Sequence, residues 1–347
     1  MFASFQFNYY SGTIGKVTKT HPVSEEMIVD ENGNQDKKSI QTLEINILNH
    51  DYKGQSMTLT NEFTYSQVNN HQYHPGDYLF IQVNPENNKL SGHVIELKRD
   101  TFLILLISML VLLLIVVSGN FGLLTFLGFI LNACLLGAIL ILYRHVNNQL
   151  LILLFIIAFP IMVALSLTLV NGWQLKTKIT TVATILGTLI TFLIGFIVIS
   201  LFNHNGLHYE EMELVTRPPH VLFLSSLLIG SVGAVMDVSM TIVSSLTEII
   251  HNKKTISLDE LNTAGKRIGE DIMGPMTNIM FFSYLSGAIP LVLIFLRNGM
   301  SFSYTFSIVL SLEIARALVG SIGIILAVPI SIKVTQFFVR KEIVHER

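Results

Sequence analysis

The chain has 347 residues, of which 51% are hydrophobic and only 13% are charged. A soluble domain usually has about a quarter of its residues charged, so this composition argues against an ordinary soluble protein. The formal net charge of −2 gives no support for the basic surface that nucleic-acid binding requires. The single cysteine, Cys134, excludes a disulfide framework and a Cys-Xaa-Xaa-Cys metal site.

Residues 1–98 are polar in composition and contain five short segments that read as β-strands separated by turn signals. Leu43, Ile45 and Ile47 show the alternation of a half-buried strand most clearly. The predicted strands are residues 9–20, 40–49, 55–61, 77–83 and 90–98. Five short strands suit a small β-barrel-like domain of the OB or SH3-like type. His71 and His74 lack regular ligand spacing, so neither a metal nor a cofactor is expected.

Residues 99–347 hold nearly all the long apolar runs, and a transmembrane helix needs about 20 apolar residues. We therefore predict an α-helical, polytopic membrane domain. Its spans are residues 101–118, 121–142, 150–170, 180–202, 220–249, 271–296 and 305–338. The last segment is long enough to contain a broken helix, so eight spans are the alternative to seven.

Lysine and arginine in the short loops predict the orientation, because cytoplasmic loops carry an excess of both. The richer set of loops contains Lys176, Lys178, Lys253, Lys254, Lys266, Arg267, Arg340, Lys341 and Arg347. The poorer set contains Arg144, Arg217 and Arg297, beside the acidic stretch 210–213. Seven spans then put the C-terminus in the cytoplasm and the N-terminal domain outside the plasma membrane.

The N-terminus itself carries no recognisable targeting signal. Residues 1–10 have neither a basic nor an apolar region, so no signal peptide is visible. A domain of this size that reaches the outside normally needs an upstream anchor. We expect that a leading segment is absent from this chain; the alternative is that the first helix acts as a reverse anchor.

Asp237 is the residue that points most strongly to function. It falls near the centre of the fifth span, where an ionisable side chain costs at least about 2.5 kcal/mol and usually marks function. Gly230 and Ala234 have the spacing that lets a neighbouring helix approach closely. Asp237 is therefore expected to face a packed interface. Glu248 lies eleven residues later, about 20° away around the helix and about 16 Å along it, which predicts a polar stripe towards the inner surface.

The next two spans carry further polar residues. Asp271 and Asn278 are seven residues apart and share a helix face, and Pro275 between them frees a backbone carbonyl. With Asp237 and Glu248 they would line the inner half of a proton or ion relay. Glu313 and Arg316 are three residues apart and are predicted to form a structural ion pair.

Two segments of the membrane domain resemble each other. Residues 228–233 (LIGSVG) match residues 318–323 (LVGSIG) at an offset of ninety, although Ala327 stands where the first copy has Asp237. The match indicates either a parallel repeat, as in transporters, or convergence on a close-packing pattern. Both explanations predict helix-packing roles for the same small residues. These are Gly230, Gly233, Ala234, Gly320 and Gly323.

The last three spans contain a series of polar and small-residue motifs: Gly233-Ala234-Val235-Met236-Asp237-Val238-Ser239-Met240, Ser244-Ser245-Leu246, Glu248-Ile249, Asp271-Ile272-Met273-Gly274, Asn278, Ile289-Pro290-Leu291 and Glu313-Ile314 with Arg316-Ala317-Leu318. These motifs resemble the YibE/F-like proteins, a family of bacterial multi-pass membrane proteins without an established biochemical role. Gly12-Thr13-Ile14 and Gly76-Asp77 suit the family's extracytoplasmic β-domain, so the resemblance covers nearly the whole chain. The chain departs from the family at Pro275 and Ile279, where a small polar residue and threonine are expected.

A weaker likeness connects the C-terminal half to SecD, SecF and the wider RND class. The shared order is a mid-membrane Asp, a Glu eleven residues later, a basic inner loop and a helix with a polar start. Those proteins use intramembrane acids as proton relays, but fold-level analogy does not establish function.

Two functions follow from these expectations. The first is a transporter or export-assisting protein in which Asp237 couples transport to a proton or another ion. The alternative is a non-transporting scaffold whose outer β-domain binds an envelope protein. Without HExxH, GxSxG or an aspartyl pair, an enzyme is not expected. Besides the lipid bilayer, the small-residue faces favour a homo-oligomer or pairing with a second family member as partners.

Overall fold

The computed structural model describes residues 7–29, 33–67, 70–86, 89–143, 145, 150–202, 206–212, 218–253 and 256–345. Several residues used to predict the orientation lie outside this described part, namely Arg144, Glu213, Arg217, Lys254 and Arg347. The chain forms two compact units, Met1–Val117 and Ser118–Arg347, and each is described by itself.

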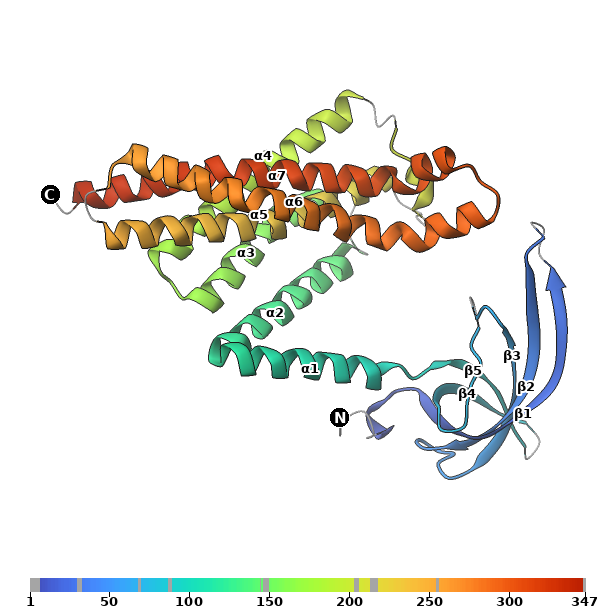
Figure 1. The fold of residues 1–347 in the computed structure, drawn as a ribbon. Coiled ribbons are helices and arrows are strands. Elements are labelled where there is room, and N and C mark those ends of the chain that lie inside the picture. Colours follow the sequence, from blue (N-terminus) through green and yellow to red (C-terminus); the bar gives the residue numbers. More distant parts are fainter. Residues whose placement is uncertain are drawn as a thin grey trace. The chain divides into compact units, whose positions relative to one another are not determined.

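The N-terminal unit contains the predicted five-stranded antiparallel sheet (Figure 1). Its strands are β1 (Thr13–Val29), β2 (Gln35–Ile47), β3 (Ser56–Thr64), β4 (Tyr78–Glu86) and β5 (Lys89–Leu97). They are ordered β3-β2-β1-β4-β5. The edge strands β3 and β5 also contact each other, so the sheet curls into a small barrel-like domain.

The core of this domain follows from strand periodicity. Leu43, Ile45 and Ile47 are fully buried, whereas the residues between them remain partly exposed. Leu79 and Ile81 of β4 pack into the same cluster. One face of the curled sheet therefore holds the hydrophobic core, as the alternation predicts.

The β1–β2 hairpin is longer than predicted. Residues 24–29 of β1 pair with residues 35–40 of β2 beyond the predicted end at Thr20. Most side chains in this half of β1 are exposed, so the pattern of a half-buried strand is absent from the sequence. Strand β2 also begins five residues before its predicted start at residue 40, at Gln35.

Asn49 fixes the chain segment that precedes β1. Its side chain is fully buried, and its Nδ2 donates to the carbonyl oxygens of Phe7 at 2.9 Å and Gly12 at 3.0 Å. Its Oδ1 accepts from the backbone N–H of Ile14 at 2.6 Å. Residue Tyr10 in this segment donates its hydroxyl to the Asp100 carboxylate, and this hydrogen bond raises the pKa of Tyr10.

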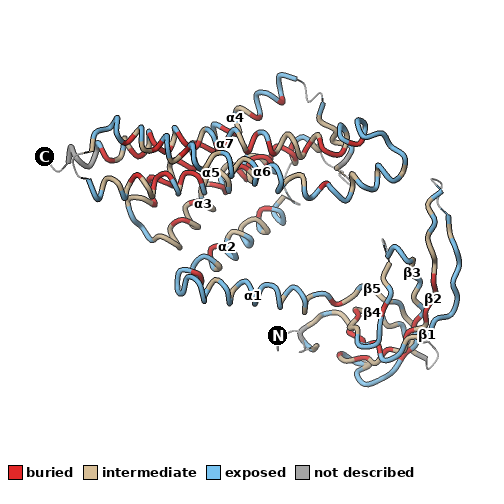
Figure 2. Tube along the Cα trace, in the orientation of Figure 1, coloured by how far each residue is buried: buried red, intermediate tan, exposed pale blue. Residues whose placement is uncertain are grey.

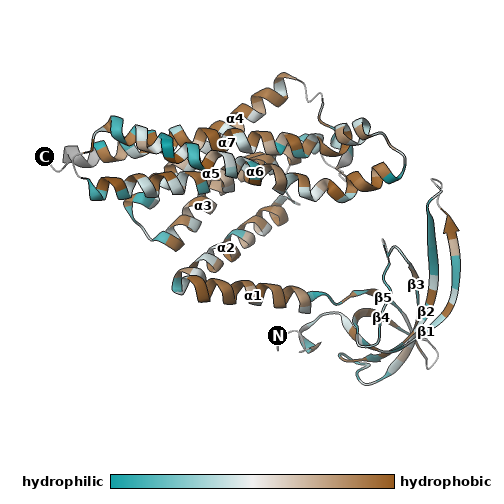
Figure 3. Cartoon of the chain, in the orientation of Figure 1, coloured by the Kyte–Doolittle hydropathy of each residue, from teal (hydrophilic) through white to brown (hydrophobic). Residues whose placement is uncertain are grey.

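Seven helices in the described residues are long and apolar enough to cross a membrane, as predicted. They are α1 (Asp100–Ser118), α2 (Asn120–Tyr143), α3 (Leu150–Asn171), α4 (Leu175–Leu201), α5 (Pro219–Asn252), α6 (Leu258–Arg297) and α7 (Phe302–His345). The last segment is one continuous helix around Pro329, so the broken helix of the eight-span alternative does not form. Helix α1 is hydrophobic along its length (Figure 3) and has no buried residue (Figure 2), which suits contact with lipid.

Helix α6 begins thirteen residues before its predicted span. Ser257 and Glu260 form a capping box, in which the Ser257 hydroxyl accepts from the Glu260 N–H and the Glu260 carboxylate accepts from the Ser257 N–H. This box satisfies two of the N–H groups that a helix start leaves unpaired. The extra turns are polar, so a hydropathy criterion alone does not include them.

Helices α5 and α7 form the centre of the membrane unit, where they pack on each other and on α4 and α6. The Arg316 side chain of α7 meets Ser226 of α5, and Gly323 of α7 lies against Val235 of α5. These contacts join residues that are 90 and 88 positions apart. The two matching sequence segments therefore run side by side and parallel, close to the register of their sequence match.

Candidate functional site

Asp237 lies near the middle of α5, and its side chain is exposed on the surface of the single chain. This differs from the expectation that it faces a packed interface. Its neighbours explain the difference, because Met236 and Met240 pack with the cluster around α3, while Ala234 packs with the cluster formed by α6 and α7. Asp237 occupies the strip of α5 that these contacts leave uncovered.

The predicted polar stripe is present on this strip. Asp237, Thr241 and Glu248 are exposed, and Ser245 is partly exposed. The Thr241 hydroxyl donates to the Asp237 backbone oxygen at 2.9 Å, and the Ser245 hydroxyl donates to the Thr241 backbone oxygen at 2.8 Å. At the C-terminal end of the strip, Asn252 donates to the Glu248 carboxylate at 3.1 Å. Among the described residues, none donates a side-chain hydrogen bond to the Asp237 carboxylate.

Asp271 and Asn278 share a face of α6, as predicted, but this face is exposed and turned away from α7. Gly269 of α6 lies against Val328 of α7, and Met280 lies against Gly320. Asp271 is two residues after Gly269, and Asn278 is two residues before Met280. Each is therefore about 200° around the helix from a residue that contacts α7. The structure brings Asp237 and Glu248 onto one strip and leaves Asp271 and Asn278 on the back of α6.

The small residues differ in how closely they are packed. A Cβ added at Gly230 would clash with the Tyr284 hydroxyl, and one added at Gly320 would clash with the end of Met280. One at Gly323 would lie 3.0 Å from both Thr191 and Val235. Gly233 has no such neighbour within 4 Å, because it lies on the same uncovered strip as Asp237.

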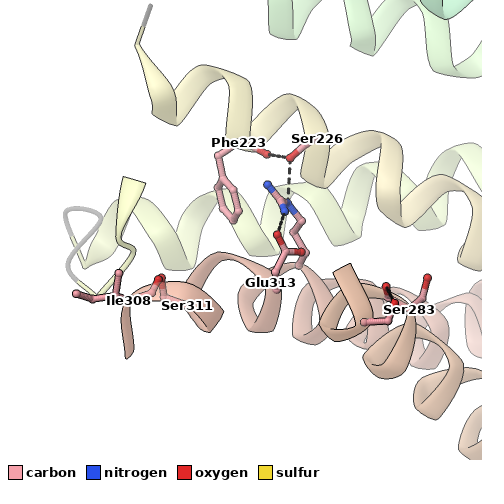
Figure 4. Close-up of polar contacts among 8 residues, drawn as sticks. Phe223, Ser226, Ser283, Ile308, Ser311 and Glu313 are labelled. Carbon is pink, nitrogen blue, oxygen red and sulfur yellow. Dashed lines mark hydrogen bonds and ion pairs between the residues drawn. The ribbon is translucent and has the colours of Figure 1, made fainter. Parts of the chain in front are cut away.

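Glu313 and Arg316 form the predicted ion pair, and Arg316 also reaches α5. Its Nε donates to the Ser226 hydroxyl at 3.2 Å, and its guanidinium lies 5.2 Å from the centre of the Phe223 ring. Figure 4 shows Ser226 and Glu313 on opposite sides of this guanidinium. Arg316 is fourteen residues into α7, about 21 Å from its start. The pair therefore lies deep within the span.

Two cavities meet at Arg316. One of about 500 Å³ lies between α6 and α7, and its polar lining includes Ser283 and Glu313. The other, of about 540 Å³, is bounded by α2, α3 and α5. Tyr284 and Arg316 line both cavities. Sequence reasoning identified the ion pair but not these cavities, because five different helices supply their walls.

The second cavity is mainly apolar. Its lining residues from α2, α3 and α5 are Leu136, Leu140, Tyr143, Leu151, Phe155, Leu222, Ser225, Ser226, Ile229 and Gly230. Ser226 and Gly230 stand on the same side of α5 as Asp237, since positions eleven and seven residues away fall within about 20° of it. The side of α5 that carries Asp237 thus also borders this cavity, although Tyr284 covers it at Gly230. Among the described residues, no group of three or more His, Cys, Asp or Glu side chains could hold a metal ion.

Comparison with known proteins gives two family matches. A family described as YibE/F-like protein matches residues 106–341. A second, described as the YibE/F family N-terminal domain, matches residues 8–97. No curated protein and no solved structure matches the chain, so the likeness to SecD and SecF stays a prediction.

Proposed function

The chain belongs to the YibE/F-like family, and from this premise we propose that it is a transporter or export-assisting membrane protein in which Asp237 takes up a proton or binds an ion. One observation supports this most strongly. The Asp237 carboxylate lies midway along a membrane-spanning helix, on an uncovered polar strip, without a described hydrogen-bond donor.

The energetics of the bilayer make such a position hard to explain as structural. A charged aspartate that faces lipid at the bilayer centre costs about 2.5–3.5 kcal/mol or more. Asp237 stabilises no helix contact that would offset this cost. The strip must therefore border water or another protein surface, and the carboxylate can alternate between its neutral and charged forms there.

The polar strip also defines the path along which the proton or ion would move. Thr241, Ser245 and Glu248 continue from Asp237 at intervals of three or four residues, over about 16 Å of helix. In the proposed orientation, with the C-terminus cytoplasmic and the β-domain outside the plasma membrane, this route leads to the cytoplasmic end of α5. The proposed path therefore covers the inner half of the membrane.

Asp271 and Asn278 have a different place in this proposal. They lie on the exposed back of α6, where polar groups at membrane depth also need a protein or water partner. We propose that a second copy of the chain, or a second family member, covers this face. In such an assembly Asp271 and Asn278 would line the inner half of the route from the partner's side.

Proton flux into liposomes that contain the purified protein tests the coupling role. Asp237→Asn keeps the size and polarity of the side chain but cannot ionise, so flux should fall to the protein-free background while membrane yield is unchanged. Glu270→Gln is the matched control, because Glu270 is an exposed carboxylate on α6 outside the strip. A loss of flux in Asp271→Asn as large as in Asp237→Asn would show that the α6 face belongs to the route.

A scaffold whose β-domain binds an envelope protein is the second candidate. The outer part of β1 favours it, because Val23, Met27 and Val29 are 61–63% exposed on a hairpin arm that the rest of the sheet does not cover. In that case Asp237→Asn would have no effect. Replacing Val23 and Met27 by serine would abolish crosslinking of the full chain to its envelope partner.

A further inference from the structure

The Arg316 guanidinium retains hydrogen-bonding capacity that the protein does not use. An arginine has five N–H donors. The Nε group of Arg316 donates to Ser226, and Nη1 donates to Glu313. No described residue accepts a hydrogen bond from Nη2. Only 17% of the Arg316 side chain and 24% of the Glu313 side chain are exposed, so both charged groups are largely shielded by the surrounding helices.

The two cavities give Arg316 two chemically different neighbourhoods, and Glu313 borders the first of them. On one side, Ser283, Tyr284 and Glu313 provide hydroxyl and carboxylate groups within about 500 Å³. On the other side, leucine and aromatic side chains of α2 and α3 surround about 540 Å³. Both volumes fall in the range of small-molecule sites, which combine apolar walls with a few placed polar groups. A molecule that fills both would have a polar head and an apolar tail.

The charge of the site selects the kind of head group. Glu313 and Arg316 neutralise each other. An uncompensated charge in a largely buried site costs several kcal/mol of stability, so a ligand should keep the site neutral. A purely anionic head would add an uncompensated negative charge beside Glu313 in this otherwise neutral site. A head with one negative and one positive group can instead give its anion to Arg316 and its ammonium to Glu313. The neutral balance of the site is then preserved.

From these three features we propose that the cavities at Arg316 and Tyr284 form one binding site for a zwitterionic amphiphile. Its phosphate or carboxylate group binds Arg316, its ammonium group binds Glu313, and its hydrocarbon chain occupies the cavity between α2, α3 and α5. This inference deepens the proposed function by naming its substrate class. Bilayer phospholipids and small zwitterions from solution share the head-group chemistry, so the experiment distinguishes the tail.

Direct binding of radiolabelled lysophosphatidylethanolamine to the purified full chain tests the site. Two competitors separate its chemical requirements, namely lysophosphatidylglycerol, which has an anionic head, and phosphoethanolamine, which has no tail. Lysophosphatidylethanolamine should bind at least tenfold more tightly than either. Equal binding of lysophosphatidylglycerol would overturn the charge pairing. Equal binding of phosphoethanolamine would show a soluble zwitterion as ligand and overturn the amphiphile assignment.

Variants decide whether the binding occurs at these cavities. The double variant Glu313→Gln with Arg316→Gln removes both charges without leaving one unpaired, and it should weaken binding of the labelled probe at least tenfold. Leu140→Trp fills the apolar cavity and should weaken the probe but not phosphoethanolamine. Gly233→Ala, in open space on α5, is the control and should bind as the wild type does. Unchanged binding in both cavity variants would mean non-specific partitioning and would overturn the proposal.

The outcome is separable from that of the coupling proposal. Asp237 lies eleven residues from Ser226, about 16 Å along α5, so Asp237→Asn should bind the probe normally even if it abolishes proton flux. Normal flux in the Glu313→Gln and Arg316→Gln double variant, together with normal binding, would refute the substrate site alone. Normal flux in Asp237→Asn would refute the coupling role alone.

Discussion

The contact between Gly230 and Tyr284 predicts a difference in stability between alanine variants at two glycines of α5, Gly230 and Gly233. A Cβ added at Gly230 would lie 3.3 Å from Cζ of Tyr284 and nearer still to its hydroxyl oxygen, closer than side-chain atoms approach one another. The Tyr284 ring, which lines both cavities, must therefore move away from α5 in this variant. Overpacking of this kind costs about 1–3 kcal/mol.

Gly233→Ala is the matched control for Gly230→Ala. Both substitutions gain the same helix propensity, up to about 1 kcal/mol, but a Cβ at Gly233 meets no atom within 4 Å. The difference between the two variants therefore isolates the contact with Tyr284. We expect Gly230→Ala to be about 1–3 kcal/mol less stable than Gly233→Ala, which itself should match or exceed the wild type.

Heating the detergent-solubilised protein and measuring the monodisperse fraction by size-exclusion chromatography gives the apparent melting temperature of each variant. For a domain of this size, 1 kcal/mol corresponds to about 2–4 °C, so Gly230→Ala should melt several degrees below Gly233→Ala. In a Tyr284→Ala background the two glycine variants should differ little from each other, because the atoms that a Cβ at Gly230 meets are then absent. Identical melting of both glycine variants would refute the packing of Tyr284 on α5 and with it the shared wall of the cavities.

Three further predictions concern the β-domain and the start of α6. Asn49→Ala leaves buried backbone groups unpaired and should destabilise the domain by about 1–3 kcal/mol, measured by hydrogen exchange in the full chain, whereas exposed Asn84→Ala should be neutral. The hydrogen bond from the Ser66 hydroxyl lowers the pKa of Asp36. The stabilisation from ionised Asp36 is therefore present above the pKa of Asp36 in the unfolded chain, and it is lost as the pH falls through the pKa of Asp36 in the folded protein. Asp36→Asn should consequently flatten the loss of stability below about pH 4, and an unchanged acid profile would contradict this assignment. Ser257→Ala removes the capping box and should cost about 0.5–2 kcal/mol, seen as faster amide exchange in the first turn of α6 but not in its middle.

Much of the fold is predictable because two periodicities dominate it. The alternation of Leu43, Ile45 and Ile47 locates the buried face of β2, and apolar runs of about 20 residues locate the seven helices. The outer half of β1 is not predictable in this way, since its exposed side chains carry no pattern of burial. The first turns of α6 are missed for a different reason, because they are too polar for a hydropathy criterion although Leu261, Gly265 and Gly269 are buried there.

Some features of the candidate site cannot be predicted from the sequence of one helix alone. The spacing of Asp237 and Glu248 on one strip could be derived from helix geometry alone. Whether that strip is covered depends on how far α3 and α6 wrap around α5, and the 60° between Asp237 and Ala234 is enough to separate an exposed residue from a packed one. The cavities at Arg316 depend on five helices meeting, and no local pattern encodes that.

Proton flux through liposomes that contain equal amounts of wild-type and Asp237→Asn protein measures the central claim most directly. We predict flux above the protein-free background for the wild type and none above that background for the variant. If both proteins carried the same flux, Asp237 would not be the coupling residue, and the polar strip of α5 would need a different explanation.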